Sequence, residues 1–82
     1  MALSKTHTAT LTGILIPAAW NAEQEVTAVA LATADEKEYR LTDNRKGREL
    51  LGYLQRQAEV TGLLSGDGSG VMLITVRRYI IK

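Results

Sequence analysis

Residues 10–15 read TLTGIL, and this stretch returns almost unchanged at 59–64 as EVTGLL. Both copies place a glycine inside a run of β-branched and apolar residues, a composition that favours strands. Such a glycine usually marks a bulge or a sharp bend where a strand turns the corner of a barrel. The repeat therefore predicts a small closed barrel with Gly13 and Gly62 at strand bends. We expect valine at either position to destabilise the fold by a few kcal/mol, because it poorly tolerates a positive φ and would crowd the corner.

Length and composition limit the possible classes of protein. The 82 residues are enough for one domain with one core, so we expect a single domain over 1–82 with a flexible N-terminus at 2–7. The chain has no cysteine, which excludes disulfides and Cys-ligated metals. No apolar run has the length of a signal peptide or a membrane span, so we expect a cytoplasmic protein without membrane contact. A formal net charge of +1 gives no general attraction to polyanions, which leaves local clusters of charge.

Five segments have the pattern of strands: 8–16, 24–34, 38–42, 58–65 and 71–81. Pro17 closes the first strand or lies on an edge, and residues 18–23 read as a connection. The second segment has alanines at alternate positions, which suits the crowded inner face of a narrow barrel. A helix over 26–34 is the alternative, although the β-branched residues there favour a strand. In the last segment Arg77 and Arg78 point to opposite faces unless a bulge intervenes.

One short helix is predicted between the third and fourth strands. Asp43 and Asn44 are suitable caps, and leucines follow at helical spacing within 45–57. Glycines at 47 and 52 weaken the helix and can shorten it to 47–54. The expected core contains the apolar positions that share a parity or helical spacing: Leu11, Leu15, Val29, Leu31, Leu41, Leu50, Leu54, Val60, Leu64, Ile74 and Val76.

Few residues suggest chemistry. The cations Arg45, Lys46 and Arg48 at the helix start are either balanced by neighbouring carboxylates or form a phosphate site. The carboxylates Asp35, Glu36 and Glu38 read as a solvated hairpin turn, and the single histidine, His7, as a surface residue. No nucleophile, base and orienting group can be assembled from the sequence. We therefore expect no enzyme, no metal site and no cofactor.

The order strand, strand, strand, helix, strand, strand, with a glycine bend in the first and fourth strands, resembles the OB-fold over residues 8–81. The segments Thr12-Gly13, Pro17 to Trp20, Lys46 to Leu50 and Val60 to Gly62 are similar to those of small stand-alone bacterial OB-fold domains of uncharacterised function. The resemblance implies an all-β, five-stranded barrel with one short helix. It also implies an oligonucleotide or oligosaccharide ligand on the second and third strands. The chain departs from the nucleic-acid version because it has one Trp, three Tyr and no Phe for stacking.

The sequence therefore favours a binding module over an enzyme. Its ligand is single-stranded nucleic acid or another oligomeric or anionic ligand; the alternative is a protein-interaction or structural domain with no small ligand. A polyanion-binding surface would combine Arg40 with Arg77 or Arg78 and a stacking ring from Trp20 or Tyr39. Trp20 is also suited to cover one end of the barrel. The sequence predicts no oligomeric state.

Overall fold

The computed structural model describes residues 7–66 and 71–82, so most of the expected flexible N-terminus and residues 67–70 lie outside it. The strands are β1 (His7–Trp20), β2 (Val26–Thr33), β3 (Glu38–Leu41), β4 (Gln57–Gly66) and β5 (Met72–Ile81). Between β3 and β4 lie the helix α1 (Arg45–Glu49) and the 3₁₀ helix η1 (Leu50–Tyr53). In the part of the chain described, no helix is long and apolar enough to cross a membrane.

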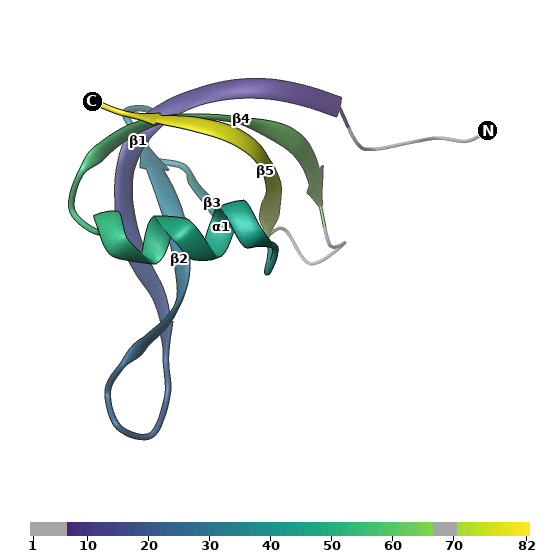
Figure 1. The fold of residues 1–82 in the computed structure, drawn as a ribbon. Helices are drawn as coiled ribbons and strands as arrows, with labels where there is room; N and C mark the ends of the chain where they lie inside the picture. The colour runs from purple at the N-terminus through teal and green to yellow at the C-terminus, as the bar shows by residue number, and fades with distance from the viewer. Residues whose placement is uncertain (1–6, 67–70) are drawn as a thin grey trace.

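The five strands close into a barrel in the order β1-β2-β3-β5-β4 (Figure 1). All neighbouring strands are antiparallel except β3 and β5, which are parallel. The long strand β1 pairs with β4 through its first half and with β2 through its second half. This is an OB-like fold with one short helix, so the predicted fold class is confirmed. The segment 26–34 forms a strand and not a helix.

Gly13 lies where β1 passes from one partner strand to the other. It is opposite Thr33 of β2 and also opposite Ala58 of β4. A Cβ atom built on Gly13 would lie 2.8 Å from the carbonyl carbon of Ala32 and nearer still to its oxygen. The neighbouring backbone therefore leaves no room for a side chain at this position.

Gly62 also lies where a neighbouring strand leaves no room for a side chain, in the pair of β4 and β5. The register of this pair shifts between Thr61 and Gly62, and Arg77 is the extra residue of the resulting bulge. A Cβ atom on Gly62 would contact the carbonyl of Thr75, with the carbonyl carbon at 2.8 Å. Neither Gly13 nor Gly62 has a positive φ, so that part of the expectation was wrong, whereas the expected crowding at both positions is present. Glycine is required because an adjacent strand approaches its Cα closely.

Pro17 lies inside β1, which continues to Trp20 where a connection was expected. The backbone N and O of Leu15, two residues earlier, face away from β2, toward Arg56 and Gln55. Residues two apart in a strand face the same way, so the N–H that Pro17 lacks would point to an unpaired edge. The register then shifts at Ala18, which is a bulge. The strand continues through Pro17 because no ladder hydrogen bond is lost.

The barrel core agrees with the parity of the sequence. All of the expected core residues are buried except Leu11 and Leu54, which are partly exposed and pack against the core. Two residues that were not expected, Tyr39 and Ala58, join the cluster. Leu50, at the junction of α1 and η1, has no exposed surface. The helical segment therefore places one fully buried leucine in the barrel core.

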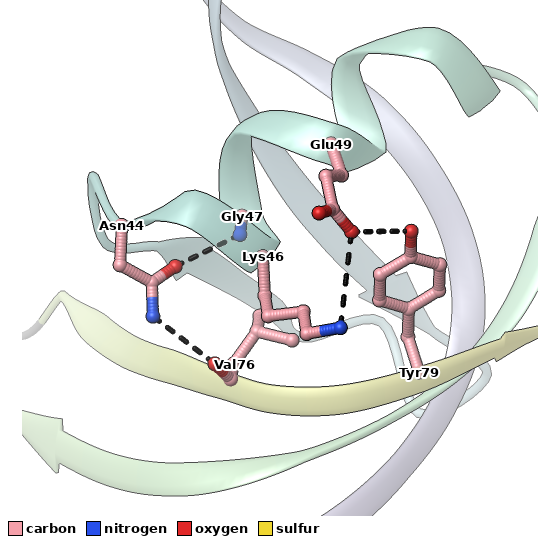
Figure 2. Close-up of polar contacts among 6 residues, drawn as sticks. All are labelled: Asn44, Lys46, Gly47, Glu49, Val76 and Tyr79. Carbon is pink, nitrogen blue, oxygen red and sulfur yellow. Dashed lines mark hydrogen bonds and ion pairs between the residues drawn. The ribbon is translucent and has the colours of Figure 1, made fainter.

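Asn44 fixes the start of α1 on the barrel (Figure 2). Its Oδ1 accepts the N–H of Gly47 at 2.8 Å, which caps the helix, and its Nδ2 donates to the carbonyl of Val76 at 3.0 Å. The helix begins at Arg45, and Gly47 is buried within it, so the expected shortening to 47–54 was wrong. One side chain thus satisfies a helix end and a strand carbonyl at once.

Tyr79 of β5 contacts α1 through its hydroxyl group (Figure 2). The hydroxyl donates to Oε1 of Glu49 at 2.8 Å, and Nζ of Lys46 lies 5.8 Å from the centre of the tyrosine ring. The hydrogen bond to the Glu49 carboxylate favours the neutral phenol. It therefore raises the pKa of Tyr79 above its ordinary value of 10.0.

We expect this contact to make stability depend on pH at the alkaline end. Because the folded-state pKa of Tyr79 lies above the unfolded one, the contact stabilises the fold fully below about pH 10. That stabilisation is lost as the pH rises through the folded-state pKa. Urea unfolding of the wild type and of Tyr79→Phe should show a difference in free energy that shrinks above about pH 10. A difference that stays constant through this range would mean that the hydroxyl contributes nothing.

Candidate binding face on strands β2 and β3

A hollow of about 390 Å³ lies on the outside of the barrel over β2 and β3. It is lined by Pro17 and Ala18 of β1, Ala30 of β2, Glu38 and Arg40 of β3, and Val71 and Met72 at the start of β5. We call this surface the β2–β3 face. It lies on the strands that bind ligands in OB-folds.

Arg40 lies across this face. Strand alternation turns it outward, because its neighbours Tyr39 and Leu41 are buried in the core. Its Nη2 donates to the carbonyl oxygen of Ala18 at 3.2 Å, reaching from β3 over β2 to β1. Ala30, the residue opposite Arg40 on β2, is only 2% exposed although it lines the hollow. A small side chain on β2 thus allows the guanidinium group to lie close to the sheet.

Trp20 is 55% exposed at the end of β1, so the expectation that it covers one end of the barrel was wrong. It is opposite Val26 in the hairpin of β1 and β2, which projects beyond the barrel (Figure 1). The register of this hairpin shifts on both sides of Ala19, so Trp20 follows two bulges. The tryptophan lies at the end of β1, beyond the residues that line the hollow at Arg40.

Asn21 shapes the turn that follows Trp20. Its Oδ1 accepts the backbone N–H groups of Glu23 and Glu25 at 2.9 and 3.0 Å. Its Nδ2 donates to the carboxylate of Glu25 at 3.0 Å, and Gln24 takes a positive φ of 68°. These hydrogen bonds stabilise the turn. Asparagine is common in such turns because its side chain can bond to backbone groups a few residues further on.

Tyr39 is not available as a stacking ring. It is 8% exposed and belongs to the core cluster, which corrects the expectation for this residue. The sequence contained the necessary signal, because Tyr39 shares its parity with Leu41 in a strand whose other face is charged. Of the two aromatic residues predicted for the site, Trp20 is exposed and Tyr39 is not.

Arg77 and Arg78 are both exposed, because the bulge at Arg77 breaks the alternation of β5. Arg78 lines a different hollow, of about 330 Å³, with Thr10, Glu59, Thr61, Tyr79 and Ile80. Leu73 of β5 is the residue opposite Arg40. Arg78 lies five residues further along β5, which is about 16 Å in an extended strand. The structure therefore does not bring Arg78 together with Arg40 in one hollow.

The lining of the hollow contains one positively and one negatively charged side chain. Glu38 lines the same hollow as Arg40, and the remaining lining is apolar. Val71 and Met72 are each 36% exposed there, and nothing in the residue pattern predicted either of them at the site. The carbonyl of Ala18 was missed as well, because a bulge cannot be read from residue types alone.

The other charged clusters are solvated. Arg48 Nε lies 3.4 Å from Asp43 Oδ1, and Lys46 Nζ lies 4.0 Å from Glu49 Oε1, which supports balanced cations over a phosphate site. In the turn after β2, the Thr33 hydroxyl donates to the Asp35 carboxylate and lowers the pKa of that group. Within residues 7–66 and 71–82, no three potential ligands gather that could hold a metal ion.

Comparisons with protein-family models, with curated proteins and with solved structures give no match. The class of protein is therefore defined by the fold alone, an OB-like five-stranded barrel. Its function has to be argued from the chemistry of the β2–β3 face.

Proposed function

We propose that the protein is a binding module that holds a segment of single-stranded nucleic acid across the β2–β3 face. The observation that carries the proposal is the position of Arg40, whose guanidinium group lies in the hollow beside β1. An arginine donor fork suits a phosphate, and the exposed ring of Trp20 suits a stacked base. The cytoplasmic setting and the likeness to bacterial domains stay predictions from the sequence.

The charges in the hollow suit contact with a single phosphate group of the ligand. Arg40 supplies one cation to the hollow, and Glu38 lies in the same lining. Each phosphate contact on a single strand contributes a slope of about −0.7 to log K against log salt. We therefore expect weak binding at low salt with a slope near that of one contact.

The single tryptophan of the chain makes the test direct. Titration of the protein with oligo-dT at low salt should quench the fluorescence of Trp20, because a base stacks on its ring. Arg40→Gln should weaken binding by about tenfold to a hundredfold, since it removes a charge-assisted hydrogen bond worth about 1.5–3 kcal/mol.

Arg78→Gln is the matched control, because it removes the same charge from the other hollow. It should leave the affinity for oligo-dT nearly unchanged. If the fluorescence does not respond at low salt, or if both variants weaken binding equally, nucleic-acid binding on this face is wrong.

A protein segment is the second candidate ligand. The observation that favours it is the neutral lining, in which Glu38 accompanies Arg40 between the apolar side chains of Pro17, Val71 and Met72. Protein interfaces combine apolar contacts with a few paired charges in this way. Failure of the oligo-dT titration would leave this candidate, with the same hollow as its site.

A further inference from the structure

The first half of β1 has a strand on one side only within the part of the chain described. Residues 7–14 pair with β4, whereas pairing with β2 starts at Gly13. The segment 7–12 therefore has an open edge on the side where β2 would lie. Figure 1 shows this half of β1 running alongside β4 past the end of β2.

The hydrogen bonds of Leu15 show which backbone groups point to the open edge. Its N–H donates to the carbonyl of Arg56 at 3.0 Å, and its carbonyl accepts the N–H of Gln55 at 2.7 Å. Both partners precede β4, so the backbone of Leu15 faces the β4 side. Successive residues of a strand face opposite sides, so even-numbered residues of β1 face away from β4.

Thr12 faces Ala34, the residue after Thr33, because Gly13 is opposite Thr33. The open edge therefore presents the N–H and C=O groups of Thr8 and Thr10. A side-chain contact agrees with this assignment. The hydroxyl groups of Thr10 and Thr61 lie 2.9 Å apart across β1 and β4. Side chains approach most closely in pairs that exchange no backbone hydrogen bonds, as expected if the backbone of Thr10 faces the other way.

This edge has none of the usual features that prevent strand pairing. The segment 7–12 reads HTATLT, without Lys, Arg, Asp, Glu or Pro, and its register with β4 has no bulge. Natural edge strands are commonly protected by charges, proline or bulges. An uncharged, regular edge rich in threonine is suited to the addition of another strand.

We propose that two copies of the chain pair antiparallel through this edge of β1. A twofold axis at Ala9 places Thr8 opposite Thr10 of the second copy, and Thr10 opposite its Thr8, which leaves the place opposite Gly13 to Thr33 of β2. Each of these pairs exchanges two backbone hydrogen bonds, and threonine pairs bring no like charges together. Because the contact is self-complementary, it closes both edges at once, which an unrelated strand would not do. The strands β5, β4 and β1 of the two copies then form one continuous sheet.

Sedimentation equilibrium tests the proposal on the full chain. The wild type should have twice the 9.0 kDa mass of one chain in the micromolar range. Thr10→Lys should weaken the dimer at least about tenfold, because it puts a cation into both threonine pairs and sets the two cations at diagonal neighbouring positions across the axis. Thr61→Lys is the matched control: it adds the same charge to the same face, on β4, which has a strand on both sides. It should leave the dimer intact.

Amide hydrogen exchange locates the contact and confirms that the variant is folded. The amides of Thr8 and Thr10 should exchange slowly in the wild type and fast in Thr10→Lys. Those of Ala9 and Leu11, which face β4, should stay slow in both. A monomer throughout the micromolar range, a dimer that survives Thr10→Lys, or fast exchange of these two threonine amides in the dimer would each overturn the proposal. The hollow at Arg40 contains none of these residues, so its test is independent.

Discussion

Replacing Gly62 with alanine is expected to lower the free energy of unfolding by about 3 kcal/mol, the upper end of typical overpacking effects. The added Cβ would contact the carbonyl of Thr75 and lie 3.1 Å from the Cα of Val76. These atoms are backbone, so no rotamer change relieves the contact. The bulge between β4 and β5 would have to move instead. Urea unfolding followed by circular dichroism measures the loss.

Gly52→Ala is the control for this prediction. A Cβ atom at Gly52 would have no atom within 4 Å, and the residue lies in η1 without a positive φ. Alanine there should be neutral or stabilise the fold by about 0.4–1 kcal/mol, because it reduces the entropy of the unfolded chain. If both glycine variants have equal stability, close backbone approach does not explain the glycine of the repeated motif.

Leu50→Ala is expected to cost about 2–5 kcal/mol, because it opens a cavity in a side-chain site without any exposed surface. A domain of this length has a total stability of about 4–12 kcal/mol. The variant should therefore be close to unfolding at room temperature. Its midpoint in urea should fall sharply while the slope of the transition stays the same.

Leu54→Ala is the matched comparison, because the same atoms are removed from a leucine that is partly exposed and packs only against the edge of the core. Its loss should be clearly smaller than that of Leu50→Ala. Equal losses would show that the helical segment is held by both leucines alike, as the sequence pattern suggests, and not mainly by Leu50.

The candidate site was partly predictable from the sequence. The alternation of β3 places Arg40 outside the barrel, and the same alternation places Tyr39 inside, where a stacking role is excluded. The exposure of Trp20 was not predictable, because Pro17 was expected to end a strand that in fact continues. The partner of Arg40, the carbonyl of Ala18, depends on a bulge that no residue type announces.

The sequence by itself determined the number of strands, the short helix and which residues face the core. These properties follow from periodicity within a few neighbouring residues, because side chains alternate in a strand and repeat every three to four residues in a helix. The tertiary structure alone decided the parallel pairing of β3 with β5, the bulge at Arg77 and the separation of Arg78 from Arg40. These features depend on hydrogen bonds between segments far apart in the chain, whose register is selected only when the barrel closes.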